Sequence, residues 1–119
     1  ILLTNFGKFV RKIRIDNGEL LKDMADVLQV TSSYLSAVEI GKRNVPIAWA
    51  EIITKHYKLN KLQEAELYTA IDDSQLNIKI DLSTYDTFDK NIVLTFARKF
   101  DTLADSDKEQ IRTLLSKHK

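Results

Sequence analysis

Apolar side chains recur at the spacing of amphipathic helices through the first part of the chain. A first helix is predicted over residues 5–16, and Asn17-Gly18 ends it. Its apolar positions follow the i, i+3, i+4, i+7 pattern and are Phe6, Phe9, Val10 and Ile13. The rest of its surface carries Lys8, Arg11, Lys12 and Arg14, which either solubilise the helix or contact phosphates.

Two short helices joined by a tight turn are predicted between Leu21 and Asn44. The turn ends at Thr31, whose hydroxyl is placed to cap a second helix over residues 32–40. Gly41 follows that helix, where a helix end favours a positive φ. One side of the second helix carries Leu35 and Val38. The opposite side carries Ser32, Ser33, Ser36, Ala37 and Ile40. A face of small residues backed by an apolar seam favours close approach to another surface.

Two further helices are predicted before residue 75. Pro46 suits the first turn of a fourth helix, because its missing N–H is not needed there. Trp49 lies on the apolar side of that helix and is predicted to be a core residue. Asn60 and Gln63 form a capping box that opens a fifth helix, which runs to about Ile71.

The hydrophobic period changes after residue 75. Leu76, Ile78, Ile80 and Leu82 alternate with polar residues, which predicts a half-buried strand. A lone strand cannot satisfy its own backbone groups, and the chain shows no second strand pattern. We therefore expect it to pair with the same strand of another copy.

Helical spacing returns after a polar segment at residues 83–90. A sixth helix is predicted over residues 91–103, with Phe96 and Phe100 on its apolar stripe. Ser106 and Glu109 are a second candidate capping box that opens a last helix. The predicted fold is therefore all-α (mainly α). It comprises a five-helix domain over residues 1–75 and a strand with two helices over residues 76–119.

Composition agrees with a helical chain. The 119 residues include only 3 Gly and 1 Pro, and 44% are hydrophobic. Without cysteine, disulfides and thiolate metal sites are excluded, which fits a cytoplasmic protein. No apolar run is long enough to cross a membrane and no signal peptide is visible. The chain starts at Ile1 rather than Met, so we expect that residues precede it.

Charge is balanced overall but not evenly distributed. Residues 1–60 contain nine Lys/Arg and six Asp/Glu, a net +3, and residues 61–119 contain nine and eleven, a net −2, which sum to +1. A basic excess in the half with the paired short helices points mildly toward nucleic acid.

No catalytic pattern emerges from the spacing of reactive residues. The serines near residue 33 lack a plausible His or Lys partner, and His56 and His118 provide no metal signature. We expect no enzyme activity, no cofactor, no metal and no small-molecule ligand.

The stretch from Leu21 to Pro46 resembles the helix-turn-helix of the Cro/lambda-repressor-like family, the xenobiotic-response-element-type regulators of bacteria and phages. Ala25 matches the small residue at the helix crossing, and Glu39-x-Gly41-Lys42-Arg43-x-x-Pro46 matches the exit from the second helix. The matching core positions are Met24, Leu28, Val30, Leu35 and Val38. The departures are Gln29 in place of a turn glycine, Ile40 in place of Asn or Arg, and Leu20-Leu21 in place of a capping residue and a phosphate-contacting Gln. The resemblance covers about residues 5–72.

This resemblance implies a sequence-specific regulator of transcription, expected to be a repressor, that binds an inverted repeat in double-stranded DNA as a homodimer. The second of the paired helices enters the major groove. Base edges are expected to meet Ser32, Ser33 and Ala37, with Tyr34 and Ser36 at the margins. The DNA backbone is expected to meet Lys42, Arg43 and Asn44. The dimerisation residues are expected to be Leu76, Ile78, Ile80, Leu82, Phe96 and Phe100. If the chain does not bind DNA, the serines are an ordinary polar helix surface and residues 42–44 are an ordinary basic loop.

The main alternative keeps the same fold in another role. In that case the chain is an antitoxin or an adaptor, and its C-terminal half binds a different protein. The strong helical periodicity of residues 91–115 favours a folded element and therefore self-association.

Overall fold

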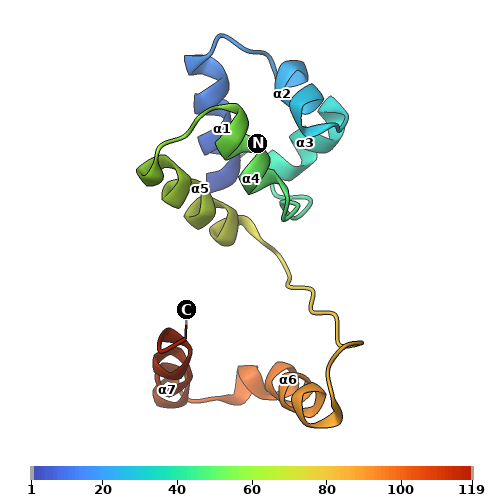
Figure 1. Cartoon of the computed structure of the whole chain (residues 1–119), viewed down its shortest axis with the longest axis vertical. Coiled ribbons are helices and arrows are strands. Elements are labelled where there is room, and N and C mark those ends of the chain that lie inside the picture. Colours follow the sequence, from blue (N-terminus) through green and yellow to red (C-terminus); the bar gives the residue numbers. More distant parts are fainter. Residues whose placement is uncertain (1, 119) are drawn as a thin grey trace. The chain divides into compact units, whose positions relative to one another are not determined.

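The computed structural model describes residues 2–118 and is mainly helical (Figure 1). The chain divides into two compact units, residues 1–78 and 79–119, here named the N-terminal unit and the C-terminal unit. The predicted helical fold class is confirmed. Within residues 2–118, no helix has the length and apolar character needed to cross a lipid bilayer.

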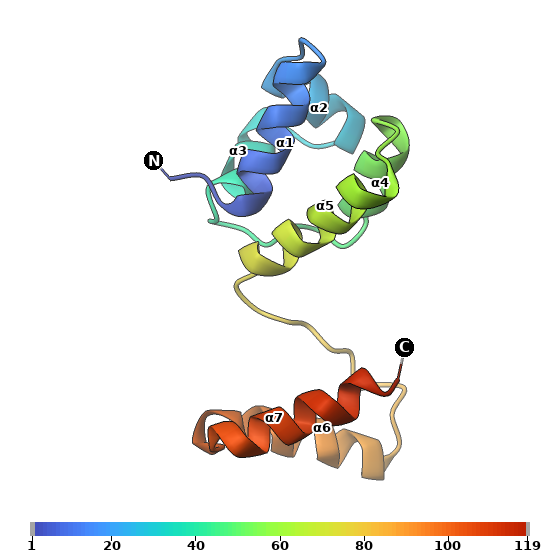
Figure 2. The same cartoon turned by 90° about the vertical axis from the view of Figure 1, so that its left-hand side faces the viewer.

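Five helices form the N-terminal unit. They are α1 (Asn5–Asp16), α2 (Leu21–Leu28), α3 (Ser32–Glu39), α4 (Trp49–His56) and α5 (Lys61–Ser74). α1 packs along α5 and also contacts α3, while α4 contacts both α2 and α5 (Figure 2). One hydrophobic core lies between them. Its most deeply buried side chains are Phe6, Val10, Met24, Leu35, Val38, Ile53 and Leu67. Trp49 is buried in the same core, as predicted.

The predicted helix ends in this unit are largely confirmed. Thr31 caps α3 by accepting a hydrogen bond from the Tyr34 N–H at 3.0 Å, and Gly41 has φ 85°. Asn60 and Gln63 form the predicted capping box of α5. Gln29 ends α2 in the left-handed conformation with φ 58°, which a residue with a Cβ adopts at a cost of about 1–2 kcal/mol.

α4 begins later than predicted. Its first residue is Trp49, so Pro46 lies in the loop before it instead of in its first turn. The Pro46 carbonyl accepts a hydrogen bond from the Trp49 N–H at 3.1 Å. The fixed φ of proline therefore shapes a turn that leads into the helix.

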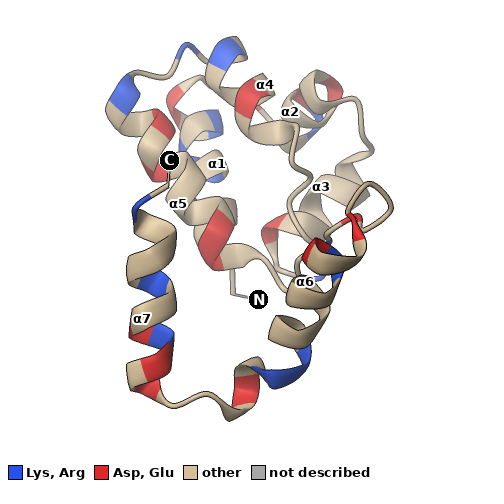
Figure 3. Cartoon of the chain, turned by 60° about the horizontal axis from the view of Figure 1, so that its bottom comes forward, with Lys and Arg blue, Asp and Glu red and all other residues tan. Residues whose placement is uncertain are grey.

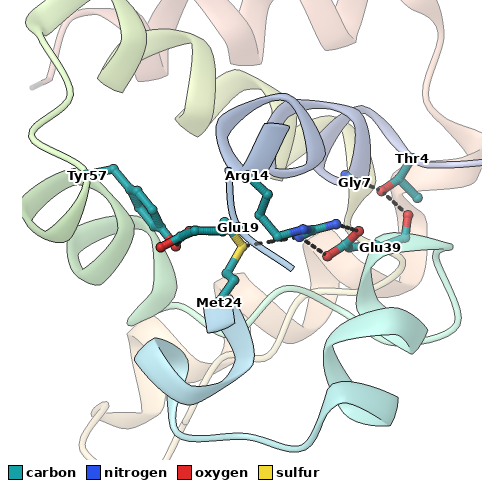
Figure 4. A network of polar contacts seen from close by, with 7 residues as sticks. All are labelled: Thr4, Gly7, Arg14, Glu19, Met24, Glu39 and Tyr57. Atoms are coloured by element: carbon teal, nitrogen blue, oxygen red, sulfur yellow. Dashed lines mark hydrogen bonds and ion pairs between the residues drawn. The ribbon is translucent and has the colours of Figure 1, made fainter. Parts of the chain in front are cut away.

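Glu39, the last residue of α3, joins α3 to α1 through its buried carboxylate (Figure 4). Arg14 donates to it twice, with Nη1–Oε2 at 2.7 Å and Nη2–Oε1 at 3.0 Å. Arg14 is only 7% exposed, so its predicted place on the solvated face of the first helix is wrong. The reason is that Arg14 continues the row of Phe6 and Val10, which points into the core.

The backbone of Glu39 makes a second connection to the start of α1. Its carbonyl accepts hydrogen bonds from both the N–H and the hydroxyl of Thr4, each at 2.9 Å. The same hydroxyl caps α1 by accepting a hydrogen bond from the Gly7 N–H at 3.0 Å (Figure 4). A Cβ on Gly7 would lie 2.4 Å from the Glu39 oxygen, so glycine is what lets the two backbones meet.

The C-terminal unit contains α6 (Thr87–Lys99), the short 3-10 helix η1 (Phe100–Thr102) and α7 (Asp105–Ser116). α6 begins four residues earlier than predicted because Asp86 caps it, accepting from the Asp89 N–H at 2.8 Å. α7 begins at Asp105, so Ser106 lies inside the helix and the predicted capping box with Glu109 is wrong. None of the described residues in α6, η1 or α7 is buried.

The predicted strand at Leu76–Leu82 is not found, and residues 2–118 contain no strand. Alternation is a local signal, whereas a strand requires a ladder of hydrogen bonds with a neighbour that this chain does not supply. Leu76, Ile78 and Ile80 are exposed, and Leu82 is half-buried. Pairing of this segment with a second copy stays a prediction.

Gly7→Ala tests the close contact between α1 and α3. Helix propensity alone favours alanine at this position by about 1 kcal/mol. The clash with the Glu39 carbonyl should outweigh this gain and lower the free energy of unfolding by about 1–3 kcal/mol. Thermal or urea unfolding followed by circular dichroism measures the change.

Gly18→Ala is the matched control for this substitution. A Cβ there meets nothing within 4 Å, and its cost comes only from the positive φ of 64°. If Gly7→Ala stabilises the protein, the close contact is absent.

Candidate nucleic-acid interface

The outward face of α3 lines a shallow hollow of ≈ 370 Å³. The burial of Leu35, Val38 and Glu39 fixes the rotation of the helix, so its small residues turn outward. The residues around the hollow are Leu21, Ser32, Ser33, Ser36, Ala37, Ile40 and Lys42. Four of the five residues predicted to meet base edges therefore lie together on one open surface, and α2 supplies its edge through Leu21.

Tyr34, the fifth of these residues, lies outside this hollow. Its ring packs edge-on against Trp49, with centroids 6.0 Å apart. The Arg43 guanidinium lies over the same ring, 5.0 Å from its centroid. A cation–π contact of this kind contributes about 0.5–1 kcal/mol at an exposed site. Tyr34 therefore links the core to Arg43 and holds that cation beside α3.

A second hollow of ≈ 350 Å³ lies next to the first, and Lys42 lines both. The full lining of this second hollow is Tyr34, Lys42, Arg43, Asn44, Leu76 and Asn77. Lys42 and Arg43 are exposed. The structure therefore brings the predicted backbone-contacting residues together, and it adds two residues that follow α5.

The Asn44 side chain is occupied by the chain itself. Its Nδ2 donates to the backbone oxygen of Asn77 at 3.0 Å and to Asn77 Oδ1, and its Oδ1 accepts from the Leu76 N–H at 2.7 Å. Gln75 makes a similar pair of bonds with the neighbouring Val45, accepting from its N–H at 2.8 Å and donating to its carbonyl at 3.0 Å. Asn44 thus has partners within the chain, and its contact with the DNA backbone stays a prediction.

The first turn of α2 carries one exposed charge of each sign, Lys22 and Asp23. The Asp23 carboxylate accepts a hydrogen bond from the Leu20 N–H at 2.8 Å. This carboxylate satisfies one of the free amides at the helix start and repels a phosphate there. Lys22 and Asp23 offset one another at the start of α2, so the net positive charge of the candidate interface comes from Lys42 and Arg43 after α3.

Charge counted by structural unit gives a different picture from charge counted by sequence halves. Residues 1–78 contain ten Lys/Arg and ten Asp/Glu, a net 0, and residues 79–119 contain eight and seven, a net +1. The acidic residues that offset the basic excess lie on α5 and are Glu64, Glu66, Asp72 and Asp73. The positive charge of the candidate interface is therefore local to Lys42 and Arg43.

The predicted dimerisation residues are divided between the two units. Leu76 and Ile78 belong to the N-terminal unit, and the rest belong to the C-terminal unit. Phe96 and Phe100 lie together, with ring centroids 5.3 Å apart. In the described part of the chain, no group of three or more His, Asp or Glu side chains is placed to hold a metal ion.

Comparisons with known proteins find no match among protein-family models, curated proteins or solved structures.

Proposed function

We propose that the chain is a sequence-specific double-stranded DNA-binding regulator that reads the major groove with α3. The observation that carries this proposal is the open face of Ser32, Ser33, Ser36 and Ala37, backed by a buried seam and flanked by two exposed cations. A helix fits the major groove, and small side chains allow it to come close to the base edges. The resemblance to Cro/lambda-repressor-like regulators supports the same use of this helix.

Base readout by this face is modest in strength. Serine donates to or accepts from several bases, and alanine contacts a thymine methyl. Neither provides the bidentate contact that arginine makes with guanine. Lys42 and Arg43 contribute sequence-independent attraction to phosphates, so specificity also depends on the shape of the DNA.

We further propose that the protein acts as a homodimer through its C-terminal unit. This unit has 41 residues, a size at which a chain rarely builds a sufficient core alone. Large apolar side chains remain exposed on it, with Phe88 at 72% and Leu115 at 64%. Such surface is costly in water and favours association.

A hollow of ≈ 410 Å³ in the C-terminal unit provides a place for an apolar partner. Its apolar lining is Phe96, Phe100, Ile111 and Leu115. Lys108 and Arg112 also line the hollow, and exposed acidic residues lie on the same unit, including Asp89 in the first turn of α6. Both charge signs occur on α6 and α7 (Figure 3). A surface of mixed sign with a net charge near zero suits a second copy better than a strongly acidic or basic partner.

The direct test of DNA binding is a mobility shift with duplex DNA at two salt concentrations. Phosphate contacts make affinity fall steeply as salt rises. A chain that shifts no duplex at low salt is not a DNA-binding protein. In that case the exposed C-terminal unit favours the alternative, an antitoxin or adaptor that binds another protein.

Arg43→Ala should weaken binding to all DNA sequences about equally. If Arg43 neutralises one phosphate, the slope of log affinity against log salt should fall by about 1. Fluorescence anisotropy over a salt series measures this slope. Lys61→Ala removes an exposed cation from α5 and should leave the slope unchanged. If Arg43→Ala and the wild type show the same slope, Arg43 does not contact a phosphate.

Ala37→Glu should abolish specific binding while the fold survives, because the change puts a carboxylate against phosphates and base edges on an open face. Binding is measured on a duplex selected from a random-sequence pool, and folding by circular dichroism. Ala65→Glu, on the exposed side of α5, is the matched control and should bind normally. Normal binding by Ala37→Glu means that α3 does not read the DNA.

Phe96→Asp should convert the dimer into a monomer. Phe96 lies in the C-terminal unit and is 44% exposed, so the change leaves the N-terminal core intact and places a charge at the hollow proposed to receive the partner. Light scattering over a range of protein concentrations measures the mass. Tyr68→Asp replaces a comparably exposed ring on α5 and should leave the dimer intact. A wild-type protein that stays monomeric contradicts the homodimer.

A further inference from the structure

We infer that Asn44 and Gln75 are positioning residues for DNA binding: they fix the loop that carries Arg43 to the chain segment that follows α5. This inference rests on the proposed function. The contacts that support it lie wholly within the N-terminal unit. Neither amide needs to touch DNA, because each acts through the loop that it holds.

The loop between α3 and α4 has little other support. Among residues 43–48, which the structure describes in full, Val45 has the one backbone N–H that donates a hydrogen bond, and its acceptor is Gln75 Oε1. The Val45 side chain is buried, and the Arg43 guanidinium lies over Tyr34. The loop is thus held by one apolar anchor, one cation–π contact, the hydrogen bond from the Trp49 N–H to the Pro46 carbonyl, and the two amide side chains.

Asn44 also holds the start of the segment beyond α5. Asn44 Oδ1 accepts from the Leu76 N–H, and Asn44 Nδ2 donates to the backbone of Asn77. Residues 76 and 77 consequently form a wall of the hollow that Lys42 and Arg43 line. Leu76 and Asn77, at the start of the segment that follows α5, are therefore part of the candidate DNA-binding surface. They lie more than thirty residues from α3 in sequence.

A loop that is already in its bound position loses less conformational entropy when DNA binds. Removing either amide leaves the charges of Lys42 and Arg43 unchanged. The number of phosphates neutralised should then stay the same while the affinity falls. This pattern differs from that of Arg43→Ala, which removes a charge and lowers the salt slope.

The test compares Asn44→Ala and Gln75→Ala with the wild type in the full chain. The probe is a random-sequence duplex of about 30 base pairs, roughly three helical turns. Its binding is measured by fluorescence anisotropy over a salt series. Each variant should bind about three- to ten-fold more weakly, with the salt slope unchanged. Hydrogen exchange without DNA should show that the Val45 and Leu76 amides exchange faster in Gln75→Ala and Asn44→Ala, respectively.

Gln63→Ala is the matched control for a general loss of stability. Gln63 lies on α5, and its side chain, like that of Gln75, accepts a hydrogen bond from a backbone N–H, that of Asn60 at 2.9 Å. Its removal should lower stability without changing DNA affinity when all proteins are compared well below their melting temperatures.

Three results overturn the inference, and they are distinguishable. Wild-type affinity in both Asn44→Ala and Gln75→Ala shows that the loop needs no such support, while the proposed function stands. An equal loss in Gln63→Ala assigns the effect to stability alone. A wild-type chain that does not bind the duplex at low salt removes the proposed function together with the inference.

Discussion

The fold of the N-terminal unit depends on the buried contact between Arg14 and Glu39. Desolvating two charges is costly, and removing one partner of such a pair typically destabilises a protein by about 3–5 kcal/mol. The two parallel hydrogen bonds leave little freedom in how α1 and α3 face each other. The Glu39 carbonyl adds the bonds to Thr4, and Gly7 allows the approach. Because Glu39 is the last residue of α3, its inward carboxylate also sets which side of α3 faces outward.

Local sequence pattern predicts well those features that local physics decides. Helical spacing identifies the helices, and Thr31, Gly41 and Asn60 mark three of their ends because capping involves residues only a few positions apart. The start of α6 was predicted four residues too late, although the sequence marks it in the same way. Asp86 is a favourable N-cap residue, three positions before Asp89. The position of Arg14 on the same row as Phe6 and Val10 also indicated a buried cation, but not its partner.

The features that sequence pattern missed depend on contacts between distant residues. Alternation at Leu76–Leu82 predicts a strand, yet a strand exists only where another strand accepts its hydrogen bonds. Likewise, the sequence predicts that Asn44 contacts the DNA backbone, and only the fold reveals its bonds to residues 76 and 77. The four small residues of the α3 face were predictable together because one helix carries them all.

The two units bury their apolar residues in opposite ways, and this difference bears on how the chain works. The N-terminal unit closes a core around Phe6 and Leu35 and leaves small polar residues on the outer face of α3. The described residues of α6 and α7 include none that are buried, so their apolar side chains favour a partner. The segment that leads from α5 to α6 contains Leu76 and Asn77, which Asn44 holds beside Arg43. If the C-terminal unit pairs two copies, this segment connects the pairing surface to the residues that Asn44 holds. Under the proposed function, the Asn44 side chain then links the segment that leads to the dimer with the loop that carries Arg43.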